Sequence, residues 1–409
     1  MTWLVVAVGL ILLVFLHELG HFGIALAVGL RPRSFYIGFP PAIAKIRRGG
    51  IEYGIGAIPL GGLVRIPGMH RPAGHDLETF MSPALREDAC LAPLVQAARR
   101  ALDREDFAGA RALQPQLEEA VGAAKLSPRA LRSARRALRD LEEGTGADAY
   151  WRAATWRRVA VIAAGPLTNV LVAFVILFAV YTTGGPTRNP SAEVAAVEPG
   201  SPAAAAGLRA GDRVVAVDGR HASTFDAVSR MIRASHGAPV SLTVERGGRR
   251  LTLGPRRTVF QGGHWIWGFN PAPLLVARSA GDAARSAASD MWGVVSSTGQ
   301  TIGSLFAGRA RGHIQSTVGI VRTSHSSLEV GFTWYLLIVG FVSMSLALLN
   351  LLPLLPLDGG HILFSLIEGV RRRALAREVY ERFSVVGIAL ILLVFAIALS
   401  NDVSGVGPH

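Results

Sequence analysis

The sequence predicts a mainly α-helical membrane protein with four transmembrane helices and several water-exposed parts. Half of the 409 residues are hydrophobic, and the mean hydropathy of +0.36 is high for a soluble enzyme but low for a chain made only of spans. Four apolar segments approach the length needed to cross a hydrocarbon core of about 30 Å. They cover residues 2–30, 159–182, 332–357 and 385–399. The last is short, so we expect its helix to begin at Phe383 or Ser384.

The charge composition excludes some functions. The formal net charge is +13, and arginine supplies nearly all of the positive charge because Lys45 and Lys125 are the only lysines. Biased codon usage and basic loops beside a membrane explain this excess better than nucleic-acid binding does. The single cysteine, Cys90, excludes an internal disulfide and a cysteine-based zinc cluster.

Arginines near the span ends predict the orientation in the membrane. They gather in the first long loop and between the last two spans: Arg31, Arg33, Arg152, Arg157, Arg158, Arg371, Arg372, Arg373, Arg377 and Arg382. Both loops are therefore predicted to be cytoplasmic, which puts both termini and residues 183–331 outside. His17 lies 14 residues beyond Trp3, roughly 21 Å along a helix, and so in the cytoplasmic half of the bilayer.

The first apolar segment contains His17-Glu18-Leu19-Gly20-His21. On a helix, this spacing places two imidazoles on one face, where both can bind one zinc ion while the glutamate acts as a general base. Ionisable groups are costly inside a bilayer and normally face a protein interior or cavity. A cleaved signal peptide is disfavoured because residues 1–16 carry no basic residue and no small-x-small site precedes the motif.

A third zinc ligand is expected because catalytic zinc sites usually have three protein ligands. Asp358 follows Asn350-Leu351-Leu352-Pro353-Leu354-Leu355-Pro356-Leu357 at the inner end of the third span. The two prolines interrupt helical hydrogen bonding, and Gly359-Gly360 adds freedom just past the carboxylate. We therefore expect a local break that turns Asp358 towards the first span. The alternative is an ordinary kinked helix with a polar cap.

These motifs resemble those of the site-2 proteases, and in particular the bacterial branch that cleaves membrane-bound anti-sigma factors. The matching segments appear in the family's order: His17–His21, Gly38-Phe39 through Tyr53 with 58–64 and Pro67-Gly68, Ala164-Gly165-Pro166-Leu167-Thr168-Asn169, and 350–360. The resemblance implies one Zn²⁺ per chain, held by His17, His21 and Asp358, with Glu18 as the base. It also implies that Asn169 and Asn350 hold the substrate backbone or the developing oxyanion. Residues 84–148 are the main stretch without a match.

The segment after the first span is expected to form a membrane-associated β-hairpin region. Small residues alternate along 51–58, so Ile55, Gly56 and Ala57 could offer an open edge that binds an extended substrate by strand addition. An ordinary short hairpin around Arg48-Gly49-Gly50 is an equal alternative.

Residues 191–255 alternate strand, turn and short-helix patterns. The order resembles a single PDZ domain, best matched from Gly207-Leu208 to Gly219. Such a domain could bind chain termini or exclude large ectodomains from the active site, and we favour the second role.

Residues 82–143 are charged, alanine-rich and predicted to be helical. Ser82-Pro83 and Ser127-Pro128 each match an N-cap followed by proline at the first helical position. Two apolar stripes predict a self-packed bundle, with a regulatory docking surface as the alternative. The stripes are Leu91, Leu94, Val95, Ala98 and Leu102, and Leu131, Ala134, Leu138 and Leu141. A weakly amphipathic helix is expected over 283–306.

The expected domains follow from these patterns. They are the zinc-motif helix (1–30), the β-hairpin region (31–81), a cytoplasmic helical insertion (82–148), the second span (149–183), the PDZ-like domain (184–260), an extracytoplasmic linker with an amphipathic helix (261–331), the third span with its ligand motif (332–370), and the fourth span with a tail (371–409).

The predicted function is zinc-dependent intramembrane proteolysis in a bacterial cytoplasmic membrane. Expected partners are single-span membrane protein substrates such as anti-sigma factors, the lipid bilayer, and a peptide or chain terminus at the PDZ-like domain; no nucleic acid is expected. A proteolytically silent PDZ scaffold is the main alternative, but it would have no use for Glu18. A metal transporter fits the PDZ-like domain poorly.

Overall fold

The computed structural model divides the chain into two compact units. We call residues 1–176 and 289–409 the membrane unit and residues 177–288 the β-rich unit. The structure describes residues 2–69, 71–187, 192–261, 263–272, 275–306, 321, 323–325, 327–328, 331–373, 375 and 377–404. Residues 307–320 of the predicted linker and 405–409 of the predicted tail lie outside this range.

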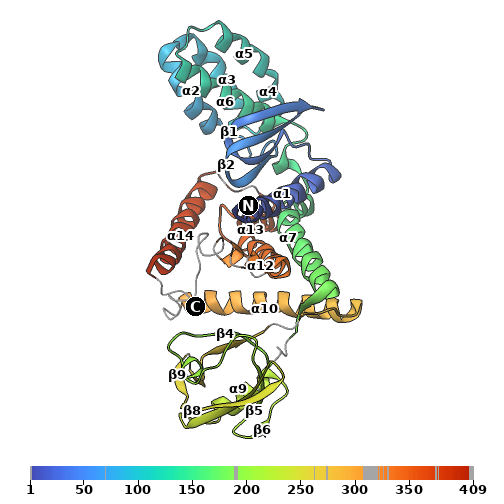
Figure 1. Cartoon of the computed structure of the whole chain (residues 1–409). Coiled ribbons are helices and arrows are strands. Elements are labelled where there is room, and N and C mark those ends of the chain that lie inside the picture. The colour runs from blue at the N-terminus through green and yellow to red at the C-terminus, as the bar shows by residue number, and fades with distance from the viewer. Residues whose placement is uncertain are drawn as a thin grey trace. The chain divides into compact units, whose positions relative to one another are not determined.

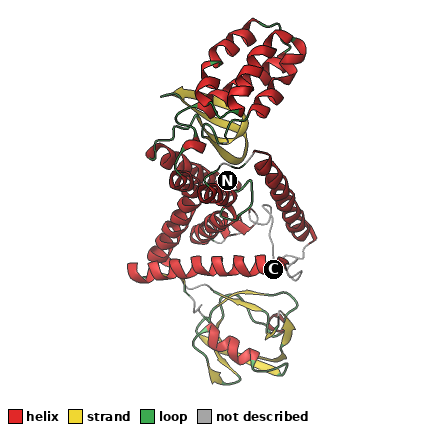
Figure 2. Cartoon of the chain, turned by 180° about the vertical axis from the view of Figure 1, so that it is seen from behind, coloured by secondary structure: helices red, strands yellow, loops and turns green. Residues whose placement is uncertain are grey.

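Most of the membrane unit is helical (Figures 1 and 2). Its elements are α1 (Thr2–Ala27), β1 (Ser34–Arg48), β2 (Ile51–Arg65), α2 (Gly74–Glu87), η1 (Ala89–Leu91), α3 (Ala92–Asp103), α4 (Phe107–Ala112), α5 (Gln114–Ala123), α6 (Pro128–Thr145), η2 (Tyr150–Arg152), α12 (Phe332–Asn350), α13 (Asp358–Arg371) and α14 (Arg377–Ser404). Two further helices, α7 (Thr155–Gly184) and α10 (Ala280–Phe306), cross the boundary between the units.

The four predicted spans are all present as long apolar helices. Within the described residues, the segments long and apolar enough to cross a membrane are Thr2–Ala27, Thr155–Gly184, Phe332–Asn350 and Glu378–Ser400. The third span ends at Asn350, seven residues earlier than the predicted end at Leu357, because Pro353 and Pro356 follow. Val6, Leu13, Tyr335 and Val339 form a small core where α1 meets α12.

Strands β1 and β2 form a bent sheet in which each strand takes part twice. Residues 34–37 pair with 62–65 on one side and with 52–55 on the other, and 44–48 pair with 51–55. Ile55 therefore has partners on both sides, Ile37 and Ala44. The bend of β1 brings its first residues back onto β2, so residues of β1 lie on both sides of Ile55.

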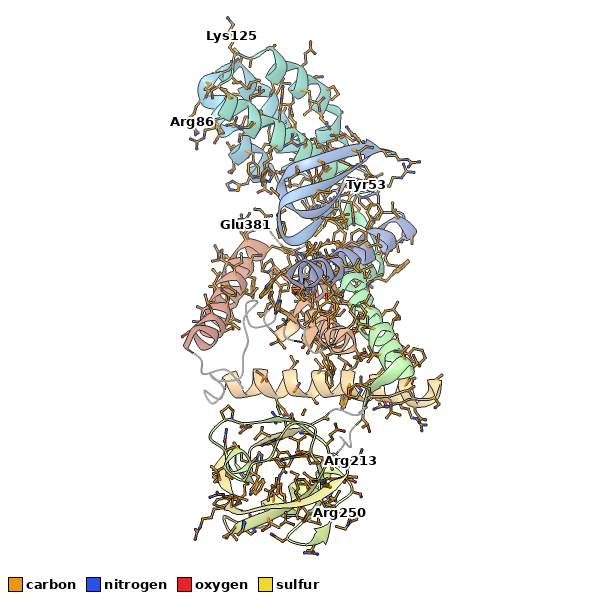
Figure 3. All side chains as sticks on the ribbon, viewed as in Figure 1. Tyr53, Arg86, Lys125, Arg213, Arg250 and Glu381 are labelled. Carbon is orange, nitrogen blue, oxygen red and sulfur yellow. The ribbon has the colours of Figure 1, made fainter. Side chains whose placement is uncertain are left out.

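The insertion packs on itself, which confirms the favoured interpretation. Helices α2 to α6 enclose their own core, which includes Leu77, Met81, Leu91, Val95, Ala98, Leu102, Ala134, Leu138 and Leu141. Charged side chains such as Arg86 and Lys125 lie on its outside (Figure 3). The Ser127 cap is confirmed, since its Oγ accepts the N–H of Ala130. The Ser82 cap is wrong: α2 begins at Gly74, so that Leu77 and Met81 join the core and Pro83 lies inside the helix.

The β-rich unit is built around a four-stranded antiparallel sheet in the order β6-β5-β7-β8. Its elements are β3 (Gly185–Pro186), β4 (Val194–Val197), α8 (Pro202–Ala205), β5 (Arg213–Val217), β6 (Arg220–His221), α9 (Phe225–Arg233), β7 (Pro239–Arg246), β8 (Arg249–Arg257), β9 (Val259–Gln261), β10 (His264–Ile266), β11 (Phe269–Pro271) and β12 (Leu275–Val276). Strand β11 pairs with β4, and Trp267 and Phe269 belong to the core. The packed unit thus continues past the predicted boundary at 260.

Candidate metal centre

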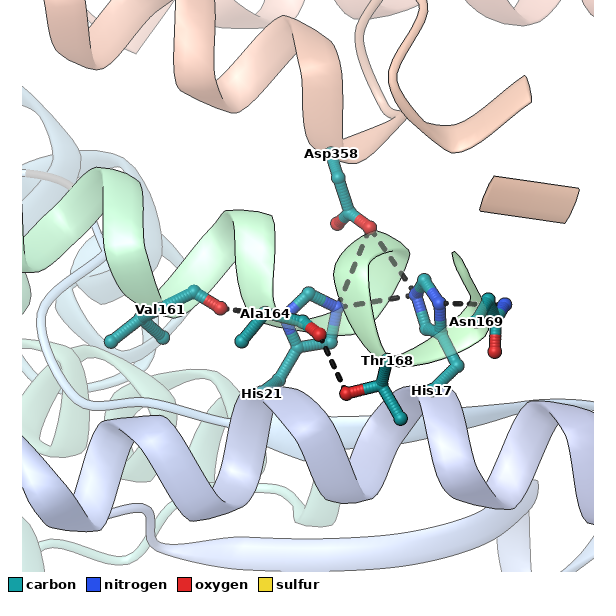
Figure 4. A network of polar contacts seen from close by, with 7 residues as sticks. All are labelled: His17, His21, Val161, Ala164, Thr168, Asn169 and Asp358. Atoms are coloured by element: carbon teal, nitrogen blue, oxygen red, sulfur yellow. Dashed lines mark hydrogen bonds and ion pairs between the residues drawn. The ribbon is translucent and has the colours of Figure 1, made fainter. Parts of the chain in front are cut away.

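Helix α1 holds His17 and His21 on one face, as the i, i+4 spacing predicts. Both imidazoles are buried, and their Nε2 atoms lie 3.2 Å apart with the ring planes at 82°. The two rings therefore point at one common position from below, as Figure 4 shows.

Helix α7 fixes the opposite nitrogen of each ring (Figure 4). His21 Nδ1 lies 2.8 Å from the carbonyl oxygen of Val161, to which it donates, and His17 Nδ1 lies 3.2 Å from the side-chain amide of Asn169. Both contacts leave the Nε2 atoms facing the common position. Outer hydrogen bonds of this kind set the tautomer and orientation of histidine ligands.

Close contact between α1 and α7 depends on two glycines. A Cβ atom on Gly165 would overlap the imidazoles of His21 and His17, and one on Gly20 would overlap Thr168 and the carbonyl of Ala164. With hydrogen at these positions, the two helices approach closely enough for α7 to support both rings.

Asp358 comes to the same place from the other end of the chain. It is the first residue of α13, directly after the break at 351–357. Its Oδ2 lies 3.2 Å from His17 Nε2 and 3.4 Å from His21 Nε2. A Cβ on Gly359 would overlap the carbonyl oxygens of Leu351 and Leu352, so the folded-back loop requires glycine for space.

These three side chains could hold one metal ion, and their spacing fits zinc. Their ligand atoms lie within 4.8 Å of one another. Two atoms bound to tetrahedral zinc at about 2.0–2.1 Å are separated by about 3.3 Å, close to the distances found here. Asp358 Oδ2 is also buried without a hydrogen-bond partner among the described residues. A cation satisfies this oxygen, whereas two neutral imidazoles that point their lone pairs at it do not.

The Asn169 amide is best placed with its oxygen towards His17. In the present orientation Nδ2 faces His17 Nδ1, and Oδ1 is buried without a partner within the described part of the chain. Amide orientation is assigned from hydrogen bonding, and exchanging the two atoms lets Oδ1 accept the Nδ1–H of a metal-bound imidazole. Asn169 has no exposed surface, which favours a role in orienting His17.

Glu18 lies between the histidines and the β-sheet. Its side chain packs on Gly62, where a Cβ would overlap it, and it interacts with the backbone of Val64. It is also within electrostatic reach of His17, His21 and Asp358. Ring contacts of Phe22 with Phe35 and Tyr53 hold the sheet against α1.

The structure therefore brings together five of the predicted site residues, namely His17, Glu18, His21, Asn169 and Asp358. Asn350 ends α12 half-buried, with no described contact to the histidines. Ile55 and Gly56 are paired within the sheet, to Ala44 and Ala42 respectively. Binding of a substrate strand at Ile55, Gly56 and Ala57 stays a prediction.

The supporting role of Val161, Gly165 and Gly62 was not predicted, although Gly165 and Gly62 lie in motifs that match the family. One signal was present: Val161, Gly165 and Asn169 repeat at four-residue intervals on α7, which places them on one face. Nothing in the local sequence of β2 indicates that Gly62 meets Glu18, because that contact depends on how the sheet docks on α1.

Known proteins similar to this chain are named as zinc metalloproteases or proteases, which accords with a zinc site. The model of peptidase family M50 matches residues 5–394. A Mesorhizobium japonicum protein named "putative zinc metalloprotease" is 29% identical over 97% of this chain and 96% of its own length. The zinc metalloprotease RasP of Geobacillus kaustophilus is 28% identical over 96% of this chain and 95% of its own length. An Enterococcus faecalis protein named "probable protease eep" is 25% identical, with 96% of each chain covered.

Proposed function

Since the chain belongs to peptidase family M50, the site-2 protease family, we propose that this metalloprotease cleaves single-span membrane proteins within or near their transmembrane helices. Anti-sigma factors or similar membrane-bound regulators are the proposed substrates. The supporting observation is the convergence of His17, His21 and Asp358 from opposite ends of the chain onto one buried position. The helices that carry the histidines and precede Asp358 are long and apolar enough to cross a membrane, which supports a site within the bilayer.

We assign zinc to His17 Nε2, His21 Nε2 and Asp358 Oδ2. Zinc bound there would supply a water of lowered pKa and would polarise the scissile carbonyl. Residues of the chain supply the remaining catalytic roles. Val161 and Asn169 hold the imidazoles in the ligand tautomer, and Glu18, beside the same position, accepts the proton of the attacking water and passes it to the leaving amine. Gly62 leaves Glu18 the space that this role requires.

Substrate binding is assigned to the groups that border the centre. A helical substrate must unwind before its carbonyls can be reached, and an extended segment can then pair with backbone groups of the β1–β2 sheet near Gly56 and Ala57. Asn350, eight residues before Asp358, supplies the donor for the developing oxyanion. A silent scaffold is disfavoured because Glu18 is held beside the histidines, where a purely structural site has no need of a base.

The distribution of charge supports an orientation in the bacterial inner membrane. With basic residues flanking the 31–158 loop and the α13–α14 turn, these parts face the cytoplasm. The β-rich unit and both termini then lie outside. We propose that this unit is PDZ-like and acts as a size filter for substrate ectodomains.

Replacement of the base and of a ligand tests the function. Glu18→Gln keeps the side-chain shape but cannot accept the proton, so we expect cleavage of a co-expressed single-span reporter to fall by at least about 10²-fold while bound zinc stays equal to wild type. Asp358→Ala removes a ligand, so the zinc-to-protein ratio in elemental analysis should fall as well. Normal cleavage by Glu18→Gln would reject this site as the protease centre.

A further inference from the structure

A buried ion pair joins α7 to α13 at a distance from the metal centre. Arg158 lies in the first turn of α7 and Glu368 near the end of α13, with side chains only 8% and 9% exposed. Arg158 Nη1 donates to Glu368 Oε2. The other carboxylate oxygen accepts the backbone N–H of Leu375 at 2.8 Å and the hydroxyl of Tyr380 at 3.3 Å.

Stability alone does not explain this pair. Removing two charges from water costs more than their attraction returns unless the geometry is very good, and two apolar side chains often serve as well. Here Arg158 Nε is buried without a hydrogen-bond partner in the described part of the chain, so the guanidinium is incompletely satisfied. Burying the Arg158–Glu368 pair costs free energy, and the pair is directional. We therefore explain it by the register that it imposes on α7 and α13.

The same two helices also border the metal centre: α13 begins with the ligand Asp358, and α7 packs on the histidines through Gly165 in its first half. Asp358 is ten residues before Glu368, and Gly165 is seven residues after Arg158. At 1.5 Å per residue, Asp358 lies roughly 15 Å along α13 from the ion pair. Gly369 adjoins Glu368 and contacts Thr155 so closely that a Cβ there would crowd the threonine side chain. The helices are therefore fixed side by side at the end where the ion pair lies.

Asp358 is coupled to this fixed end because it is the first residue of the helix that carries Glu368. It follows the irregular segment 351–357, while α13 continues from it as one helix to Arg371. A tilt of about 4° about the ion pair would move Asp358 by about 1 Å along a roughly 15 Å lever. A shift of that size is enough to spoil a site that requires ligand atoms within about 0.5 Å of their productive positions.

We propose that the Arg158–Glu368 pair is a positioning device for the third ligand: it sets the register of α13 against α7, so that Asp358 reaches His17 and His21. The proposal rests on the ligand set assigned above. Arg158 and Glu368 do not touch the metal position and act through the helix that carries Asp358.

The test is zinc affinity of the full-length protein in detergent, measured by competition with a chelator. Glu368→Gln keeps an acceptor for Leu375 and Tyr380 but breaks the ion pair, so we expect zinc to bind about 10-fold or more weakly. Arg158→Lys keeps the charge and should stay within a few-fold of wild type. The double exchange Arg158→Glu/Glu368→Arg should recover part of the loss caused by Glu368→Gln.

Two variants separate this role from general destabilisation. Glu78→Gln breaks the Arg99–Glu78 pair of the insertion and should leave zinc affinity unchanged. Tyr380→Phe removes the contact of Glu368 with α14 but keeps the ion pair, and it should also bind zinc normally. Wild-type zinc affinity in Glu368→Gln, whatever its melting temperature, would overturn the proposal.

If Glu368→Gln does not fold, the apolar pair Arg158→Met/Glu368→Leu replaces it. This variant removes both buried charges together, so we expect a folded protein with weakened zinc binding. Wild-type affinity in it would overturn the proposal. Asp358→Ala distinguishes the two hypotheses: unchanged zinc affinity there refutes the ligand set, whereas loss there with normal affinity in the apolar pair refutes only the positioning role.

Discussion

Three lone pairs converge at the centre. The carbonyl of Val161 takes the Nδ1–H of His21, so Nε2 of that neutral ring is an acceptor, and Asn169 produces the same result at His17 once its oxygen faces Nδ1. The Asp358 carboxylate adds a third acceptor at 3.2 and 3.4 Å. Acceptors so close together, away from water, repel unless a cation lies between them. The individual residues therefore specify a metal site by their chemistry alone.

Gly165 provides a sharp test at this scale. We expect Gly165→Ala to weaken zinc binding by at least about 10-fold, since the added Cβ would displace both imidazoles from α7. Zinc titration against a chelator measures this. Gly23→Ala is the matched control: it lies on α1, has nothing within 4 Å of the added Cβ, and gains the same helix propensity. Equal zinc affinity in the two variants would show that the α7 contact does not support the rings.

Elements were predictable where local chemistry decides them. The His17–His21 spacing placed two ligands on one helix face, and Pro353 and Pro356 marked the break before Asp358. The Ser127 cap was correct because its partner is three residues away, whereas the Ser82 cap failed because core packing by Leu77 extends α2 towards its N-terminus. Contacts such as Gly62 with Glu18, or Ile55 with Ile37, depend on how elements dock, which local patterns do not encode.

In the β-rich unit, a buried carboxylate joins β5 to β7. Asp212, just before β5, pairs with Arg246 of β7 through contacts of 2.6 and 2.7 Å and accepts the N–H of Arg209 at 2.8 Å. Burial by itself raises the pKa of Asp212, but these hydrogen bonds outweigh it and hold that pKa below its ordinary value. The carboxylate therefore stabilises the folded unit in its ionised form.

The pH dependence of this unit follows from the lowered pKa of Asp212. Its stabilising contribution is complete above the ordinary aspartate pKa of about 3.9 and is lost as the pH falls through the lower folded-state value. Hydrogen exchange of the β5 and β7 amides, corrected for intrinsic rates, should therefore rise as the pH falls below about 3.9. Asp212→Asn should destabilise the unit by about 1.5–3 kcal/mol at pH 7 and flatten this dependence. An unchanged pH profile in Asp212→Asn would assign the effect to other groups.

Across the whole molecule, the metal centre is assembled entirely from the membrane unit, by α1, α7 and α13. The family match from 5 to 394 accords with this, because the centre needs both ends of the chain. The insertion contributes no residue to it, and its core closes on itself. Its two ends also meet, since Gly144 lies against Pro72. Helices α2 to α6 therefore form a separate packed unit inserted into the loop before α7.

Removal of the insertion tests that separation. We expect a chain lacking residues 74–143, rejoined by a short glycine linker, to bind zinc with an affinity within about two-fold of wild type, because contacts such as Tyr150 N–H to Pro67 O (2.9 Å) remain. Met81→Asp, which buries a charge in the insertion core and should unfold it in place, is expected to behave alike. Cleavage of a fixed single-span reporter can then be compared directly. If zinc is lost from both variants, the bundle supports the centre through β2, where Arg65 pairs with Glu143 at 3.0 Å; if zinc stays and only cleavage changes, the bundle acts on the substrate.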